Sequence, residues 1–242
     1  MSIFAISDLH LSLGCDKPMD VFGSKWLNYT ERMRKNWNSI VTASDYVIIP
    51  GDISWATYID DAVRDFEYIN NLNGKKILLK GNHDYWWTTA SKMTKFFEKN
   101  NFDTIRFVQN NSVIISDNNR KIAICGTRGW CVEGSPDFKE QDRKIYLREA
   151  ERLKLALSAA EKVKEEGDGI IALIHYPPFN VRRENSLFTD LFEKYGVSDA
   201  VYGHLHGKDC RTDLKIEKNG VRYILTSCDQ VDNKLTLIKE EK

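Results

Sequence analysis

The 242-residue sequence predicts an α/β fold in a single domain, and two observations support this interpretation. In the first half, short apolar runs alternate with amphipathic segments, as in strand–helix–strand units of a parallel sheet with right-handed crossovers. No repeat, linker or low-complexity segment interrupts the chain. We therefore expect one domain over residues 1–242, and hydrophobic residues make up 42% of the chain, enough for a sizeable core.

The expected elements of the first half follow the alternation along the chain. Helices are expected over Met19–Ala43, Ala56–Leu72 and Thr88–Lys99, the second with apolar residues at three- and four-residue spacing. Short apolar segments that end at Pro50 and Lys80 lie between these helices, as buried parallel strands do. Across the whole chain, the apolar runs are Ile3–Ile6, Tyr46–Ile49, Ile77–Leu79, Ile170–Ile174 and Ala200–Tyr202.

In the second half the pattern becomes partly antiparallel. Ile105–Thr127 predicts strand, turn and strand, with the turn at Asp117–Asn119. Helices are expected over roughly Asp137–Glu166 and over Ser186–Tyr195. The longer helix carries a charged face opposite an apolar face of Leu147, Ala150, Leu153 and Leu157. Antiparallel strands around Asn219-Gly220 are expected at Lys215–Glu217, Val221–Thr226 and Lys234–Ile238.

Charge and cysteine usage exclude several classes of protein. Thirty-five basic and thirty-five acidic residues cancel, so no bulk positive field attracts nucleic acid, which disfavours a nucleic-acid partner and a nuclease but leaves a local basic patch open. No apolar stretch is long enough to span a membrane, and the N-terminus has no export signal, so a cytoplasmic protein is expected. Five scattered cysteines without a C-x-x-C pair indicate reduced thiols.

All five histidines lie in short polar clusters, each directly after an apolar run. Because the carboxyl ends of strands in an open α/β sheet form the ligand-binding crevice, we expect these clusters to meet at one edge of the sheet. Asp, Asn and His supply the oxygen and nitrogen donors that hold divalent metals. The clusters are Asp8-Leu9-His10, Gly51-Asp52, Gly81-Asn82-His83-Asp84, His175 and Gly203-His204-Leu205-His206.

This ordered set of motifs resembles the full signature of the calcineurin-like metallophosphoesterases, from residue 8 to residue 206. The resemblance implies two mixed β-sheets packed as a sandwich flanked by helices. It also implies two ions, the first held by Asp8, His10 and His206 and the second by Asn82, His175 and His204, with Asp52 bridging both. His83 would stay off the metals and face the substrate, with Asp84 beside it to set its orientation or charge.

The implied chemistry is hydrolysis of a phosphoric ester. A hydroxide bridging the two ions would attack phosphorus in line with the leaving oxygen. Asn82 would ligate without adding negative charge, so the site would keep its attraction for a phosphoryl group. His83 suits protonation of the leaving group because its pKa is ordinarily near neutrality. Mixed nitrogen and oxygen donors accept manganese, iron, cobalt, nickel or zinc, so the metal's identity stays open.

The expected partner is a small phosphoester, most simply a phosphodiester. A phosphomonoesterase or phosphoprotein phosphatase is the alternative, and an interaction scaffold is disfavoured because every signature residue is present. Arg128 is a candidate phosphate clamp, with a solvent-facing arginine as the competing interpretation. Trp86 is a candidate for the substrate wall, together with its neighbours Tyr85 and Trp87 and with Trp55, but tryptophans in such positions also fill cores. The oligomeric state is left open.

Overall fold

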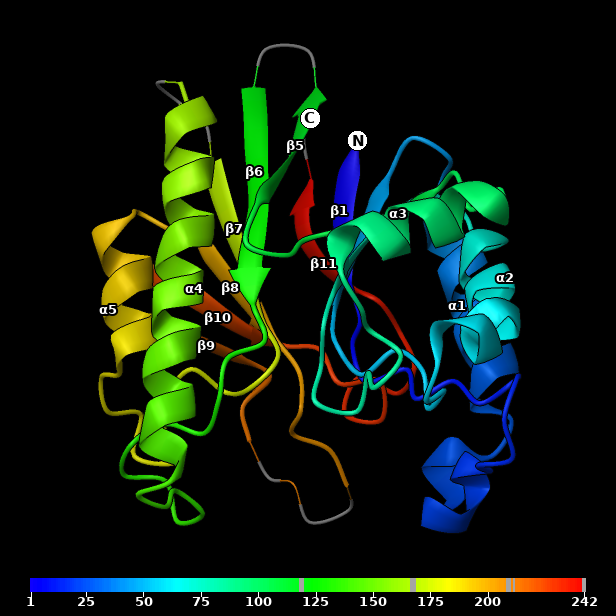
Figure 1. The fold of residues 1–242 in the computed structure, drawn as a ribbon, viewed down its shortest axis with the longest axis horizontal. Coiled ribbons are helices and arrows are strands. Elements are labelled where there is room, and N and C mark those ends of the chain that lie inside the picture. Colours follow the sequence, from blue (N-terminus) through cyan, green and yellow to red (C-terminus); the bar gives the residue numbers. More distant parts are fainter. Residues whose placement is uncertain (118–119, 166–168, 208–209, 211, 241–242) are drawn as a thin grey trace.

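The computed structural model describes residues 1–117, 120–165, 169–207, 210 and 212–240, and its strands form two sheets. The strand order is β11-β1-β2-β3-β4 in the five-stranded sheet and β5-β6-β7-β8-β10-β9 in the six-stranded sheet. Figure 1 shows the sheets face to face, with helices on both outer sides. The prediction of two mixed sheets between layers of helix is confirmed.

The five-stranded sheet is built mainly from the N-terminal half. Strands β1 (Ser2–Ala5), β2 (Tyr46–Pro50), β3 (Lys75–Leu79) and β4 (Ile105–Phe107) run parallel, and β11 (Thr236–Glu240) is antiparallel to β1. The last strand was expected at 234–238 among the antiparallel strands that precede it. It begins two residues later and pairs with β1 in the other sheet, which sequence order alone does not indicate.

The six-stranded sheet contains β5 (Ser112–Asp117), β6 (Arg120–Thr127), β7 (Gly169–Ile174), β8 (Asp199–Tyr202), β9 (Lys215–Lys218) and β10 (Val221–Leu225). β6, β7, β8 and β10 are mutually parallel, while β5 and β9 are antiparallel edge strands. The segment 105–127 therefore splits between the sheets, because β4 pairs with β3. Asn118 and Asn119 of the expected turn lie outside the described residues.

The helices of the first half are shorter than predicted. In the segment 19–43, Gly23 (φ 116°) and Asn28 (φ 49°) interrupt the helix, so only short 3-10 turns over 19–22 and 24–26 precede α1 (Tyr29–Ile40). Similarly, a 3-10 turn over Ile59–Ala62 precedes α2 (Val63–Asn70). α3 (Ala90–Lys99) begins after Thr89, whose side chain accepts a hydrogen bond from the backbone of Lys92 and caps the helix.

The helices of the second half follow the prediction more closely. α4 covers Asp142–Val163, and α5 covers Leu187–Lys194 behind a capping box formed by Ser186 and Thr189. Glu166, the expected end of the long helix, lies outside the described residues. On α4, Ala150, Leu153 and Leu157 are buried, but Leu147 is 47% exposed, so it does not belong to the apolar face.

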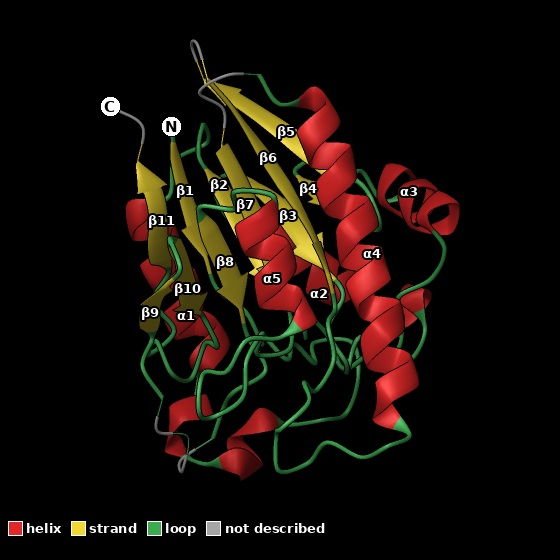
Figure 2. Ribbon diagram, turned by 90° about the vertical axis from the view of Figure 1, so that its left-hand side faces the viewer, coloured by secondary structure: helices red, strands yellow, loops and turns green. Residues whose placement is uncertain are grey.

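Three buried cores hold these layers together. One fills the space between the sheets, one packs α1, α2 and α3 against the first sheet, and one packs α4 and α5 against the second. The loops at the carboxyl ends of the parallel strands gather at one end of this sandwich (Figure 2). None of the described helices is long and apolar enough to cross a membrane.

Candidate metal centre

The predicted ligands come from strands of both sheets rather than from one edge of a single sheet. β1, β2 and β3 of the first sheet and β7 and β8 of the second end at the same end of the sandwich. Several contacts join the sheets there: for example, Nδ1 of His175 lies 3.0 Å from the carbonyl oxygen of Pro50, and the backbone N–H of His204 donates to the Asp8 carboxylate at 3.0 Å. The sequence therefore predicted the convergence correctly but not the layer that each cluster comes from.

Four of the predicted ligands have left-handed backbone conformations. Their φ angles are 55° at Asp8, 44° at His10, 53° at Asp52 and 70° at His204. Such conformations are costly for residues other than glycine and persist only where surrounding contacts impose them. Here the backbone N–H of Asp8 donates to the Gly51 carbonyl and that of His10 donates to the Asp52 carbonyl, both at 3.0 Å. Concentrated strain of this kind is typical of functional sites.

Glycine allows the loops to approach one another closely. A Cβ at Gly203 would lie 2.4 Å from an Asp8 carboxylate oxygen, and a Cβ at Gly81 would lie 2.1 Å from an Asp52 carboxylate oxygen. Both separations are shorter than van der Waals contact. The glycines of the motifs are therefore required so that the carboxylates can lie against the neighbouring loop.

The first predicted ligand set is assembled. Ligand atoms of Asp8, His10 and His206 lie within 4.8 Å of one another, and the rings of His10 and His206 are 5.3 Å apart. Asp52 adjoins this set, because its Oδ2 atom lies 3.8 Å from Nε2 of His10.

The second predicted ligand set lies on the other side of Asp52. Oδ1 of Asn82 is 2.6 Å from Nε2 of His175 and 2.9 Å from Nδ1 of His204. Nε2 of His175 is also 3.4 Å from Oδ2 of Asp52. The same Asp52 oxygen therefore faces both sets, as a bridging carboxylate must.

Unpaired buried atoms show that these residues fit divalent cations. Oδ2 of Asp52 and both ring nitrogens of His10 are buried without a hydrogen-bond partner among the described residues. Leaving such atoms unpaired in a protein interior is unfavourable, whereas a cation would satisfy them. The oxygen and imidazole donors suit first-row divalent metals but do not select one.

The electrostatics of the metal-free site favour ligation by His10, His204 and Asp52, whereas His175 carries a proton that it must release to ligate. Burial lowers the pKa of His10 and of His204 to about 3, so both imidazoles are neutral and keep a lone pair for a metal. Burial acts to raise the pKa of Asp52, but the neighbouring imidazoles of His175 and His10 hold it below its ordinary range. Asp52 is therefore ionised. Burial also opposes a charge on His175, but the Asp52 carboxylate raises the pKa of His175 to about 9.

A further loop, residues 227–230, supports the first ligand set and was missed by the sequence analysis. The hydroxyls of Ser7 and Ser227 donate to Oδ2 of Asp8 at 2.6 and 2.8 Å. Oδ2 of Asp229 accepts the backbone N–H of Gly207 at 2.8 Å, next to His206. The signal was present, because the polar run Thr-Ser-Cys-Asp follows the apolar strand β10 just as the histidine clusters follow theirs.

His83 lies beside the first ligand set without joining it. Its ring is 5.7 Å from that of His10 and 4.6 Å from that of Trp55, while Trp55 stacks on His10 at 4.8 Å. His83 is half-buried, and its Nδ1 atom has no hydrogen-bond partner within the described part of the chain. Tyr85, 63% exposed, lies 6.2 Å from the same ring. Trp55 and Tyr85 are thus the aromatic side chains that flank His83.

The expected role of Asp84 needs correction. Its buried carboxylate accepts hydrogen bonds from four backbone N–H groups and from the indole of Trp86, and the structure records none from the His83 imidazole among its described contacts. Three of the backbone donors belong to Asp52, Ile53 and Ser54 and the fourth to Gly81. Asp84 therefore ties the bridging-carboxylate loop to the loop that carries Asn82. These contacts position the loops of the predicted metal ligands rather than the His83 ring.

Trp86 is also placed differently from the prediction. It is 2% exposed, its ring lies 4.9 Å from that of Phe66, and it belongs to the core beneath the first sheet. It fills the core and does not form a substrate wall.

Arg128 lies at the end of β6, with its side chain 21% exposed and its guanidinium 4.7 Å from the ring of Trp130. A contact of Arg128 with substrate remains a prediction.

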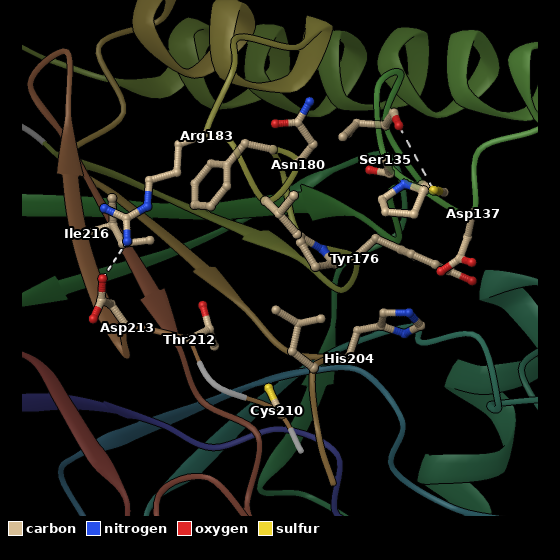
Figure 3. Close-up of a pocket in the computed structure, with 17 residues that line it drawn as sticks. Ser135, Asp137, Tyr176, Asn180, Arg183, His204, Cys210, Thr212, Asp213 and Ile216 are labelled. Carbon is tan, nitrogen blue, oxygen red and sulfur yellow. Dashed lines mark hydrogen bonds and ion pairs between the residues drawn. The ribbon is translucent and has the colours of Figure 1, made fainter. Parts of the chain in front are cut away.

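A large cavity of about 790 Å³ adjoins the second ligand set. Figure 3 shows His204 on one side of it and the Arg183–Asp213 ion pair on the opposite side. The ring of Tyr176 packs on that of His204 at 4.1 Å and forms part of the wall. Apolar side chains supply much of the remaining lining, among them Val132, Pro136, Pro177, Phe179, Leu205 and Ile216.

Comparisons with known proteins agree with this geometry. A family model described as calcineurin-like phosphoesterase matches residues 1–208. Among solved structures, the chain is similar to phosphopantetheinyl hydrolase (PptH) from Mycobacterium tuberculosis, with a TM-score of 0.59, 14% identity, and coverage of 99% of this chain and 96% of that chain. It is similar to TT1561 of Thermus thermophilus, with a TM-score of 0.59, 11% identity, and coverage of 97% and 96%. No curated protein matches. At these identities the two structures show the fold alone.

Proposed function

Because the chain belongs to the calcineurin-like phosphoesterase family, we propose that it is a dinuclear metal-dependent hydrolase of phosphoric esters that acts on phosphodiesters. The observation that carries the proposal is the position of Asp52. One unpaired oxygen of this carboxylate faces His10 at 3.8 Å and His175 at 3.4 Å, so a single residue adjoins both ligand sets. A shared carboxylate between two ligand sets is the arrangement that two-metal phosphoesterases use.

Each residue contributes a distinct property to this chemistry. Two divalent ions bound by the two sets would supply Lewis acidity and a nucleophile derived from water. Asn82 contributes a neutral oxygen, which leaves more positive charge at the site for an anionic ester. His83 is close to the first set and only half-buried, so it can hydrogen-bond the leaving oxygen or protonate it. Trp55, packed on both His10 and His83, limits the movement of the two rings.

The surroundings of the site support a diester substrate. A phosphodiester carries two organic groups, and the site has two places for them. The large cavity beside His204 and Tyr176 is lined largely by apolar side chains and can hold an extended, mainly uncharged group. The exposed ring of Tyr85 beside His83 can hold the second. The name of the similar phosphopantetheinyl hydrolase suggests one such extended group, and we include a phosphopantetheine ester among the test substrates.

A substrate panel tests the proposal. The protein is depleted of metal by chelation, one divalent ion is added back at a time, and hydrolysis of bis(p-nitrophenyl) phosphate is compared with that of p-nitrophenyl phosphate. We expect no activity without metal and a preference for the diester in kcat/KM of about tenfold or more. Asp52→Asn should abolish turnover, whereas Asp103→Asn, at an exposed site far from the ligand sets in the sequence, should not. A preference for the monoester would instead assign a phosphomonoesterase, and metal binding without hydrolysis would indicate a scaffold.

We also propose a cytoplasmic location and a small phosphoester as the partner. All five cysteines are free thiols, which supports a reducing compartment. The overall charge balance offers no general attraction for nucleic acid. Fractionation of cells that express the tagged full chain tests the location.

A further inference from the structure

A second cavity, which we call the basic pocket, lies between the two halves of the fold. It has a volume of about 480 Å³. It is lined by the segments that follow β3, β4 and β6, by the segment that precedes α3, and by one side of α4. Its charged lining residues are Lys80, Arg128, Arg148, Arg152 and Glu149.

The basic pocket concentrates positive charge in a chain whose net charge is zero. Its lining has four cations and one carboxylate, that of Glu149. Glu149 is 1% exposed and accepts hydrogen bonds from Thr127 and Arg152, both at 2.7 Å. It also lies 3.6 Å from Arg148 and 3.9 Å from Arg128. One buried carboxylate shared in this way leaves most of the cationic charge without a counter-charge in the lining.

The cationic groups keep donors for a ligand. The Arg128 side chain is 21% exposed, and the 3.9 Å contact of its guanidinium with Glu149 is too long for a hydrogen bond. The side chains of Arg148 and Arg152 are 53% and 45% exposed, so solvent or a ligand can reach their guanidinium groups.

The basic pocket and the metal centre share the same loops. The carbonyl oxygen of Arg128 accepts the backbone N–H groups of His175 at 3.0 Å and Tyr176 at 3.1 Å. Lys80 comes two residues before Asn82. A molecule bound at the metal centre therefore lies close to the loops that line the basic pocket, and occupation of one site can position a ligand for the other.

We propose that the basic pocket binds a phosphate or diphosphate group of the substrate other than the one that is hydrolysed. Arginine side chains bind phosphate through paired N–H donors, and three of them face this cavity. A phosphate ligand is favoured over a carboxylate ligand because the one carboxylate already in the lining, that of Glu149, leaves the excess positive charge of the pocket unbalanced. The binding of an anion is independent of the catalytic reaction, whereas its identity as part of the substrate rests on the proposed function.

Calorimetry with inorganic pyrophosphate tests anion binding directly. The full chain, dialysed free of metal, is titrated at low ionic strength. The variants are Arg148→Gln with Arg152→Gln, and Arg148→Gln alone, which keeps the Arg152–Glu149 contact in case the double variant folds poorly. Arg143→Gln is the matched control, because Arg143 lies on the same helix, pairs with Glu133 and Glu140, and does not line the pocket.

We expect the wild type to bind pyrophosphate without metal, and the double variant to bind about tenfold or more weakly, since each lost hydrogen bond is to a charged group. Arg148→Gln should show an intermediate loss and Arg143→Gln none. Absence of metal-independent binding, or equal binding by the wild type and the double variant, would overturn the proposal. So would an equal loss in Arg143→Gln.

Kinetics test whether the bound anion belongs to the substrate. Thymidine 5′-(p-nitrophenyl phosphate) is compared with the same compound carrying a 3′-phosphate, in the metal-loaded protein. We expect the compound with the 3′-phosphate to have the lower KM in the wild type. In the double variant the two compounds should have similar KM values, and kcat should change little in either protein. A KM ratio that the double variant leaves unaltered would refute the substrate assignment. Failure to hydrolyse either compound would instead count against the proposed function, and the calorimetric result would still stand.

Discussion

Asp84→Asn removes one carboxylate oxygen from the most heavily hydrogen-bonded side chain of the site. Oδ1 of Asp84 accepts the N–H groups of Ile53 at 2.8 Å, Ser54 at 3.2 Å and the Trp86 indole at 3.0 Å. Oδ2 accepts those of Asp52 at 3.0 Å and Gly81 at 2.7 Å. An asparagine keeps one oxygen, so its NH₂ group must face at least two N–H donors that it cannot accept.

The expected loss of stability follows from this count. A hydrogen bond to a charged group contributes about 1.5–3 kcal/mol, so two lost bonds correspond to about 3–6 kcal/mol. That is a large share of the 5–15 kcal/mol by which proteins are ordinarily stable. In a chain of this length we expect Tm to fall by roughly 6–24 °C. The loop of Asp52 should also move, so metal affinity should fall together with stability.

Denaturant unfolding and metal analysis measure both effects, with Asp103→Asn as the control for loss of an exposed negative charge. The comparison is made at about pH 8, where Asp84 is ionised. Because burial, and then the charge of Asp52, raise its pKa to about 6, ionisation lowers the stability of the wild type at this pH, and the loss in the variant should lie near the lower end of the range. A variant with normal stability and metal content but a lower kcat would refute this reasoning. That result would restore the role first predicted from the sequence, in which Asp84 acts through His83.

Three other changes have distinct expected results. His83→Asn should lower kcat about 100-fold or more, because it removes the group that assists the leaving oxygen. The variant should keep both metals, as counted by mass spectrometry. An unchanged kcat would exclude His83 from the mechanism. Gly203→Ala should lose metal content, since its Cβ would lie 2.4 Å from an Asp8 oxygen, and full metal content would show that the loop adapts. Lys76→Met should lower the free energy of unfolding by about 2–4 kcal/mol. The reason is that the buried Lys76 ammonium donates hydrogen bonds to the carbonyls of Asn70, Leu72 and Gly74. The activity per folded molecule should not change.

Three residues differ from the sequence-based prediction because of the contacts that they make. Asp84 and Trp86 were assigned to His83 and the substrate because they are near His83 in the chain. In the structure, Asp84 instead binds backbone groups about thirty residues away, and Trp86 turns into the core. Ser227 was overlooked because its contact with Asp8 spans 219 residues. Neighbours in sequence point in different directions at a sharp turn, so proximity along the chain is a poor guide to contact there.

The sequence by itself determined the donors and the order in which they occur: apolar runs that form buried strands, each followed by Asp, Asn or His at a strand end. That much is local, because strand formation and metal affinity depend on side-chain type and short-range pattern. Only the tertiary structure decided which sheet each donor comes from, how far the Asp52 oxygen lies from each ligand set, and that cations of α4 and of the segments after β3 and β6 share a cavity. Such contacts join segments far apart in the chain, and packing of the sheets and closure of the loops set their geometry.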